Sequence, residues 1–185
     1  FSLFVLVFIL SWLTPLIAIL IKFESSGPIL FKQTRNGIKY KEFTCYKFRS
    51  MIVNTNADTQ QATKNDKRVT RIGKILRKTS LDELPQFYNV LIGEMSVVGP
   101  RPHMIKENQR YSKTVSKFMV RHFVKPGITG LAQVKGYRGE IETEEDIINR
   151  VKHDIYYLEN WSLLLDLNIV FLTSINFITG QKKAY

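Results

Sequence analysis

The sequence predicts a helix-rich α/β protein that is associated with a membrane. Three observations predict this fold class. The first 21 residues carry no charged side chain, residues 29–49 contain two strand-like runs around Asn36-Gly37, and residues 64–78 follow a helical apolar pattern with a basic face. At 185 residues the chain is long enough for one domain with a sizeable core.

The apolar segment "FSLFVLVFILSWLTPLIAILI", residues 1–21, is expected to be a membrane helix. As a helix it is roughly 30 Å long, which matches a hydrocarbon core. It has neither the basic leader nor the cleavage site of a signal peptide. Pro15 removes the hydrogen bond to the Ser11 carbonyl and is expected to bend the helix. Sequence physics leaves open whether the segment crosses the membrane or turns back, and a buried core helix is the alternative.

The soluble part is expected to begin after Lys22 with a tight hairpin at Asn36-Gly37, a pair that accepts positive φ. Residues 52–66 are expected to form a loop or a weak helix. The glycine- and proline-rich runs "VVGPRP" and "KPGITG" are expected to be rigid loops. Residues 142–179 are expected to form two helices with a break near residues 160–161, and the second helix is apolar enough to lie against core or membrane.

The charge of the chain predicts anionic partners. The net charge is +11, and seven of the fifteen residues at 64–78 are Lys or Arg. Nucleic acid, phosphorylated small molecules and anionic lipid all fit this charge, but no nucleic-acid-binding motif is found, so nucleic acid is not expected. Cys45 is the only cysteine, which excludes an internal disulfide and fits a reducing compartment.

Two adjacent acids, Asp82 and Glu83, follow this basic segment in "TSLDELPQ". Ser80 and Glu83 match a capping box, and alternatively Asp82 is itself the cap with Pro85 in the first helical turn. Both registers place the acids at the start of a helix that ends at Gly93. The apolar stripe of that helix is expected to comprise Leu84, Phe87, Tyr88 and Leu91.

The position of these acids allows two interpretations. At a helix start beside basic residues, both should be ionised, and the same surroundings should attract phosphate. A carboxylate beside a phosphoryl group can attack phosphorus, hold a divalent metal or accept a proton. The alternative is that both acids only cap free N–H groups.

Three long motifs resemble the bacterial sugar transferases, which are polyprenyl-phosphate phosphoglycosyl transferases of the monotopic type. They are "YKFRSM" at 46–51, "RVTRIGKILRKTSLDELPQFYNVLIGEMSVVGPRP" at 68–102 and "RHFVKPGITGLAQVKGYRGE" at 121–140. The resemblance covers nearly the whole chain. The ending "DIYYLENWSLLLDLNIVFLT" looks like the undecaprenyl-phosphate glucose phosphotransferases. Those larger members have membrane helices and a domain ahead of this portion, so we expect a fragment beginning at Phe1.

This resemblance implies a fold, a location and a reaction. The fold is a small α/β membrane-associated domain at the cytoplasmic face of the bacterial inner membrane, with interfacial amphipathic helices. Residues 1–24 form a proline-broken, re-entrant membrane helix, and residues 25–185 form the cytoplasmic catalytic domain. The reaction transfers sugar-1-phosphate from a UDP-sugar, with UDP-glucose as the first expectation, to undecaprenyl phosphate, releases UMP, requires Mg²⁺ and initiates exopolysaccharide assembly.

The resemblance also implies roles for particular residues. Asp82 is the nucleophile that forms an aspartyl–phosphosugar, and Glu83 holds Mg²⁺. Arg77 and Arg101 match the substrate-binding arginines of the family. Further substrate-binding candidates in family motifs are Lys47, Arg49 and Arg138, whereas Asp166 matches a recurrent acid without an assigned role.

Two rival functions stay open. One is the same chemistry on galactose or an N-acetylated amino sugar. The other is a non-catalytic, membrane-anchored module that binds anions or lipid. Membrane lipid is an expected partner in each case, and homo-oligomer formation is left open.

Overall fold

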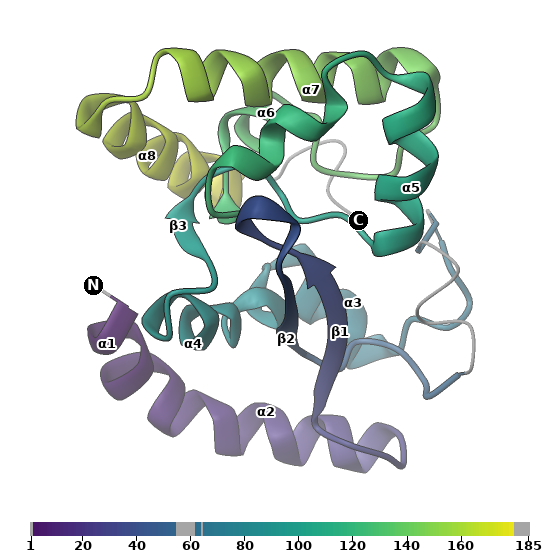
Figure 1. Cartoon of the computed structure of the whole chain (residues 1–185). Coiled ribbons are helices and arrows are strands. Elements are labelled where there is room, and N and C mark those ends of the chain that lie inside the picture. Colours follow the sequence, from purple (N-terminus) through teal and green to yellow (C-terminus); the bar gives the residue numbers. More distant parts are fainter. Residues whose placement is uncertain (1, 55–61, 64, 180–185) are drawn as a thin grey trace. The chain divides into compact units, whose positions relative to one another are not determined.

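The computed structural model describes residues 2–54, 62–63 and 65–179. Contacts divide the chain into two compact units, which are described separately. The first contains Phe1–Gln33 and Thr44–Gly93, and the second contains Thr34–Phe43 and Glu94–Ala184. The expected helix-rich α/β class is confirmed, because the described residues form many helices and two small two-stranded sheets (Figure 1). The division at residue 24 depends on the bilayer and stays a prediction.

The first unit begins with an apolar helix over Ser2–Glu24, which comprises α1 (Ser2–Phe4), the π-helical turn η1 (Val5–Leu10) and α2 (Ser11–Glu24). A complete break at Pro15 is not seen, because α2 continues through that residue, whereas the expected bend stays a prediction. The irregular turn lies one to two turns earlier, where the Trp12 indole donates to the Phe8 carbonyl at 2.8 Å. A side-chain donor of this kind satisfies a carbonyl in an irregular helix.

One side of this helix packs in the core, and the other is exposed. Ile17 and Ile21 are buried in a cluster with Phe48 and Leu76. By length and composition the helix is sufficient to cross a membrane. Its exposed large apolar side chains are Leu3, Phe4, Val7, Phe8, Trp12, Leu16, Ile19, Leu20 and Phe23. A row of this kind is typical of a surface that contacts lipid or another protein.

The predicted hairpin is confirmed as β1 (Leu30–Asn36) and β2 (Glu42–Phe48). The predicted two-residue turn is wrong. Residues 37–41 connect the strands through the short helix η2 (Ile38–Tyr40), and the positive φ angles lie at Lys39 and Tyr40. The Asn36 amide donates to the Tyr40 carbonyl at 3.2 Å, which stabilises this longer loop. Most of the segment expected at residues 52–66 lies outside the described residues.

The basic helix is confirmed as α3 (Arg71–Lys78), which is shorter than its apolar pattern suggests. It begins after Thr70, whose hydroxyl accepts from the Gly73 N–H at 2.9 Å. Val69 lies outside the helix and pairs with Met51 in an isolated bridge. Gly73 is required by close packing, because a Cβ there would lie 1.9 Å from the Ser50 carbonyl oxygen.

The second unit contains a parallel pair of short strands, β3 (Ser96–Val98) and β4 (Gly127–Thr129). Only loops were expected in these glycine- and proline-rich runs, so that expectation is wrong in part. After β3, the helical elements of the second unit are α5 (Ile105–Thr114), η4 (Phe118–Phe123), α6 (Leu131–Val134), α7 (Glu144–Glu159) and α8 (Leu163–Thr179). The predicted pair of C-terminal helices with a break near residues 160–161 is confirmed.

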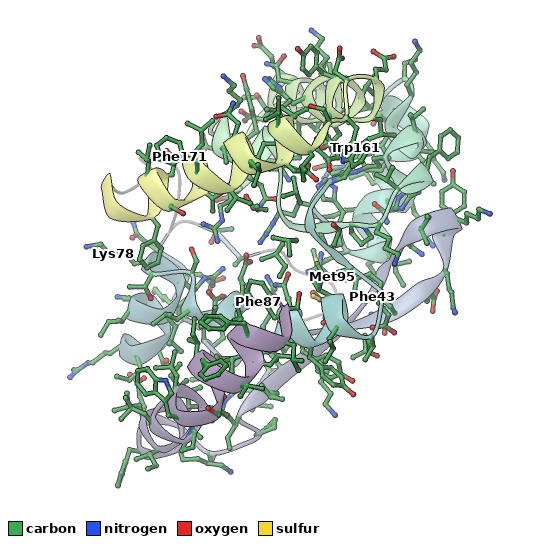
Figure 2. All side chains as sticks on the ribbon, turned by 90° about the vertical axis from the view of Figure 1, so that its left-hand side faces the viewer. Phe43, Lys78, Phe87, Met95, Trp161 and Phe171 are labelled. Carbon is green, nitrogen blue, oxygen red and sulfur yellow. The ribbon has the colours of Figure 1, made fainter. Side chains whose placement is uncertain are left out.

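Two buried clusters hold the second unit together. One joins α5, η4 and α7 through Tyr111, Phe118 and Ile147, and the other includes Tyr157 and Ile169. Helix α8 and the residues just before it nevertheless expose apolar side chains. Trp161, which precedes α8, and Phe171 on α8 are both labelled in Figure 2 and are 62% and 63% exposed. This exposure agrees with the expectation that the last helix is apolar enough to contact a membrane.

Candidate active site

Asp82 and Glu83 lie in η3 (Leu81–Glu83), a 3₁₀ turn that precedes α4 (Gln86–Leu91). Both predicted capping registers are wrong. Ser80 has a left-handed backbone, with φ of 51°, and its hydroxyl makes no capping hydrogen bond, while the residue before α4 is Pro85. Backbone bonds three residues apart, including Glu83 N–H to the Ser80 carbonyl at 3.1 Å, replace the expected helix start.

The two acids are buried, at 8% and 5% exposure. Lys47 on β2 contacts one of them, because its ammonium group lies 2.8 Å from Glu83 Oε1. A buried carboxylate is stable only with charged or hydrogen-bonding partners. The structure therefore brings together two residues that the sequence places 36 positions apart.

Asn89, on the helix that follows the acid turn, bonds that helix to β2, and it was not among the predicted site residues. Its side chain is fully buried, accepts from the Tyr46 N–H at 3.2 Å and donates to the Thr44 carbonyl at 2.7 Å. The amide thus pairs with the strand backbone as a neighbouring strand would. The available signal was a second polar residue after Gln86 in a short helix whose other residues are aromatic or aliphatic.

The predicted apolar stripe is wrong in part: Leu84 packs against the core cluster of Phe48 and Leu76 as expected, but α4 itself buries other residues. The buried positions are Gln86 and Asn89, whereas Tyr88 and Leu91 are 47% and 48% exposed. The helix ends as predicted, because Gly93 has φ of 84° and donates to the Val90 carbonyl.

Arg77 and Arg49 belong to the same unit but occupy different environments. Arg77 is half-buried in the last turn of α3, and its carbonyl accepts from the Ser80 N–H that precedes the acid turn. Arg49 is buried and donates to the Ser25 carbonyl at 2.7 Å and to the Ser26 carbonyl. Burial lowers the pKa of Arg49. These bonds indicate that Arg49 holds the chain after α2, and its role in substrate binding stays a prediction.

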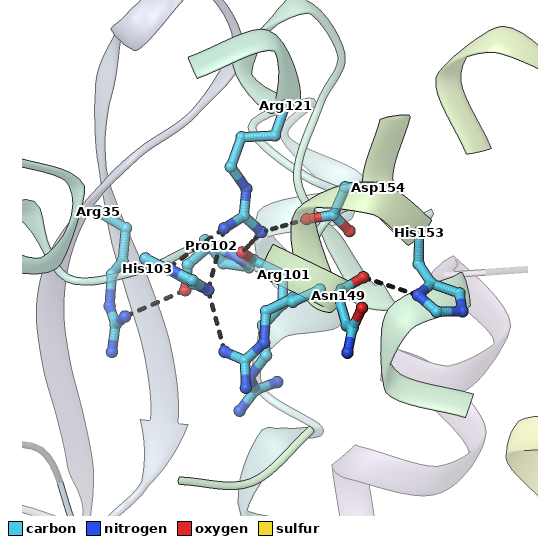
Figure 3. Close-up of polar contacts among 9 residues, drawn as sticks. Arg35, Arg101, Pro102, His103, Arg121, Asn149, His153 and Asp154 are labelled. Atoms are coloured by element: carbon cyan, nitrogen blue, oxygen red, sulfur yellow. Dashed lines mark hydrogen bonds and ion pairs between the residues drawn. The ribbon is translucent and has the colours of Figure 1, made fainter. Parts of the chain in front are cut away.

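Arg101 lies in the second unit, in the loop that follows β3. Strand pairing fixes the base of this loop: Gly99 donates to the Thr129 carbonyl at 2.9 Å, and Gly127 donates to the Pro100 carbonyl at 2.9 Å. The Arg101 carbonyl accepts from Arg121 Nη2 at 2.6 Å (Figure 3). The loop is therefore held from both sides.

Arg138 and Asp166 also belong to the second unit. Arg138 precedes Gly139, whose carbonyl accepts from Arg150 at 3.0 Å. Asp166, in the first turn of α8, accepts from the Tyr157 hydroxyl at 2.9 Å and from the Trp161 indole at 3.2 Å. Together with burial, Asp166 raises the pKa of Tyr157. These contacts assign Asp166 to the junction of α7 and α8.

The candidate site offers carboxylates for a metal but not a complete protein site. Within the described ranges, no group of three or more His, Cys, Asp or Glu side chains is arranged to hold a metal ion. Mg²⁺ is commonly bound through one or two carboxylates together with substrate phosphates and water. Two adjacent buried carboxylates, Asp82 and Glu83, fit that mode of binding.

Comparisons with known proteins identify the family of this chain. The family described as "Bacterial sugar transferase" matches residues 1–180. A UDP-glucose:undecaprenyl-phosphate glucose-1-phosphate transferase of Klebsiella pneumoniae is 53% identical over 166 residues, which cover 89% of this chain and 36% of the relative. A protein of the same name from Escherichia coli is 52% identical, with coverage of 85% and 34%.

A relative with another sugar in its name is nearly as similar. The UDP-N-acetylgalactosamine-undecaprenyl-phosphate N-acetylgalactosaminephosphotransferase of Aeromonas hydrophila is 46% identical, with coverage of 88% of this chain and 38% of the relative. The chain thus spans about a third of the length of these curated relatives. The match over residues 1–180 shows that the chain belongs to the bacterial sugar transferase family.

Proposed function

We propose that the protein containing this chain transfers sugar-1-phosphate from a UDP-sugar to undecaprenyl phosphate and releases UMP. The observation that carries the proposal is the buried acid pair Asp82-Glu83 beside Lys47, in a chain of this family. The names of its relatives describe transfer of this kind. The excess of positive charge, +11, suits two substrates that both carry phosphate.

In the first step, a carboxylate oxygen of Asp82 attacks the phosphorus that carries the sugar. An O–P bond to Asp82 forms, the bond from that phosphorus to the bridging oxygen breaks, and UMP leaves with the electron pair. Direct attack by the lipid phosphate would instead bring the two polyanionic substrates together in a single step. A covalent intermediate divides this difficult transfer into two easier ones.

In the second step, a phosphate oxygen of undecaprenyl phosphate attacks the same phosphorus. The bond to Asp82 breaks, and the carboxylate is restored, so atoms and charge balance over the cycle. Lys47 and Arg77 supply positive charge beside the acids, and guanidinium groups bind phosphate oxygens in pairs. Arg101 and Arg138 lie in family motifs and are also proposed to bind substrate phosphates.

Asp82 and Glu83 would hold Mg²⁺, with Glu83 as the main ligand. When bound, the ion would neutralise charge on the diphosphate and on the leaving UMP. Lys47 contacts Glu83 at 2.8 Å, which compensates the charge of the buried Glu83 carboxylate.

We also propose that the Ser2–Glu24 helix inserts into the cytoplasmic leaflet of the bacterial inner membrane and turns back. Its exposed apolar side supports insertion. Cysteine labelling of positions 2 and 22 in intact cells tests the topology of the native protein. Labelling of both positions from the cytoplasmic side is expected, and labelling of position 2 only from outside would show a spanning helix.

A panel of UDP-sugars incubated with Mg²⁺ and undecaprenyl phosphate tests the function. UMP release and a lipid-linked diphosphate sugar are expected with UDP-glucose first, and the panel also decides between glucose, galactose and N-acetylated amino sugars. Asp82→Asn, which keeps the shape of the side chain, is the matched control. A non-catalytic anion-binding module would release UMP from none of these donors.

A further inference from the structure

A buried polar network in the second unit contacts the loop that carries Arg101. We call it the Arg121 network, and it comprises His103, Arg121, Arg150 and Asp154 (Figure 3). All four residues are buried, with exposure of 2–4%. Buried charges of this kind are stable only when their partners are well placed, so the contacts of each member are informative.

Arg121, in η4, joins the Arg101 loop to helix α7. Its Nη2 atom donates to the Arg101 carbonyl at 2.6 Å and lies 2.9 Å from Asp154 Oδ2. Its Nη1 atom lies 3.0 Å from His103 Nε2. One guanidinium group thereby contacts the loop at its backbone, through the Arg101 carbonyl, and at the side chain of His103.

Arg150, on α7, makes the equivalent connection to a second loop. Its Nη1 atom lies 3.1 Å from His103 Nε2, and its Nη2 atom donates to the Gly139 carbonyl at 3.0 Å. Gly139 directly follows Arg138 in the sequence. The network therefore joins the loop of Arg101 to the loop of Arg138.

His103 is the shared acceptor at the centre. Guanidinium groups only donate hydrogen bonds, so a ring nitrogen that accepts from them carries a lone pair. Nε2 lies within reach of both arginines, and Arg121 Nη1 also lies 3.2 Å from Nδ1. Burial, together with the positive charges of Arg121 and Arg150, holds the pKa of His103 well below its usual range. A neutral histidine is consistent with this arrangement, whereas a protonated ring would repel both arginines.

We propose that Arg121 and Arg150 are positioning residues, which act through the Arg101 and Gly139 backbone carbonyls to set Arg101 and Arg138 for the phosphates of the nucleotide sugar. This inference rests on the proposed function. Neither arginine needs to touch substrate, because the Nη1 and Nη2 atoms of both side chains contact protein atoms.

Double-mutant cycles with UDP as the binding probe test the proposal on the whole protein in detergent. Arg101→Ala is expected to weaken UDP binding about ten-fold, and Arg121→Lys by a similar factor, because lysine lacks the planar fork that reaches three partners. In the Arg101→Ala background, Arg121→Lys should change UDP binding less than about two-fold. The pair Arg138→Ala and Arg150→Lys should behave in the same way.

The control is Val151→Ala on the same helix α7, which opens the Tyr111–Phe118 core without touching either loop carbonyl. It should lower the melting temperature and leave the UDP affinity of the folded protein unchanged. A purely structural role predicts that the lysine variants behave like Val151→Ala. Arg150→Lys leaves the Arg121–Asp154 pair in place, so it supplies the test if Arg121→Lys fails to fold.

The outcomes separate this inference from the function on which it rests. Normal UDP binding by folded Arg121→Lys and Arg150→Lys, or effects that multiply with Arg101→Ala and Arg138→Ala, would overturn the positioning role alone. A parent protein that neither binds UDP nor releases UMP would overturn both proposals.

Discussion

Replacing Lys47 by methionine removes the ammonium group beside Glu83 but keeps an unbranched side chain of similar length. The Nζ–Oε1 distance of 2.8 Å corresponds to a gross attraction of about 6 kcal/mol at an effective dielectric constant of about 20. Desolvation offsets most of this energy, because the side chains are only 21% and 7% exposed. We expect a net coupling of about 2 kcal/mol, within the range for hydrogen bonds to charged groups.

A cycle of Lys47→Met, Glu83→Gln and the double variant measures that coupling by urea unfolding in detergent. Trp12, on α2 of the first unit, supplies a fluorescence signal. The control is Lys32→Met with Glu83→Gln, since the Lys32 ammonium lies over the Tyr46 ring, 5.8 Å from its centroid. If the Lys47 and Glu83 effects add within about 0.5 kcal/mol, the ion pair contributes nothing measurable and the reasoning fails.

Three further substitutions test other parts of the structure. Gly73→Ala should destabilise the first unit by roughly 2–3 kcal/mol, because the new Cβ would meet the Ser50 carbonyl oxygen at 1.9 Å. Alanine has the higher helix propensity, so a gain in melting temperature would contradict this packing. Burial lowers the pKa of His122 to about 4, so the unfolded chain binds a proton near pH 6.5 and the folded chain does not. Stability should therefore fall by about 3 kcal/mol from pH 6.5 to 4, and His122→Gln should remove that part of the slope in pH-dependent unfolding curves, whereas parallel curves would refute it. Glu24 accepts hydrogen bonds from the first two N–H groups of α3. Glu24→Gln should lower the free energy of unfolding by about 0.3–1 kcal/mol in low salt and by less in high salt. An equal loss of stability in both would exclude a charge effect.

Local signals predicted several elements correctly. The two C-terminal helices are long and broken where the pattern breaks, and the hairpin has two strand-like runs around a turn signal. The prediction of a two-residue turn at Asn36-Gly37 failed because the connection is longer, and Lys39 and Tyr40 adopt the positive φ angles instead. Local propensity does not decide which of several neighbouring residues turns the chain when tertiary contacts hold the loop.

The other failures have a tertiary cause. Periodicity assigned the apolar residues of α4 to the core, but the fully buried Asn89 is satisfied by the backbone of β2, which lies more than 40 residues away in the sequence. Strands β3 and β4 have three residues each, which is too short for a period of two to be visible. The Arg121 network combines residues from 103 to 154, and no spacing rule connects them.

Only part of the candidate site could be predicted from the sequence. The adjacency of Asp82 and Glu83 is visible in the sequence, and family motifs select the basic residues. The Lys47–Glu83 contact and the separate role of Arg49 depend on how β2 packs against the acid turn and against the end of α2, which only the structure describes.

The central claim is that Asp82 carries the sugar phosphate as a covalent intermediate. Peptide mass spectrometry after rapid acid quench of enzyme, Mg²⁺ and UDP-glucose, with no lipid acceptor, measures this directly. The account predicts release of about one equivalent of UMP and a sugar-phosphate adduct on the peptide that contains Asp82, both absent in Asp82→Asn once deamidation is excluded. UMP release only when undecaprenyl phosphate is present, or an adduct on another residue, would contradict the account.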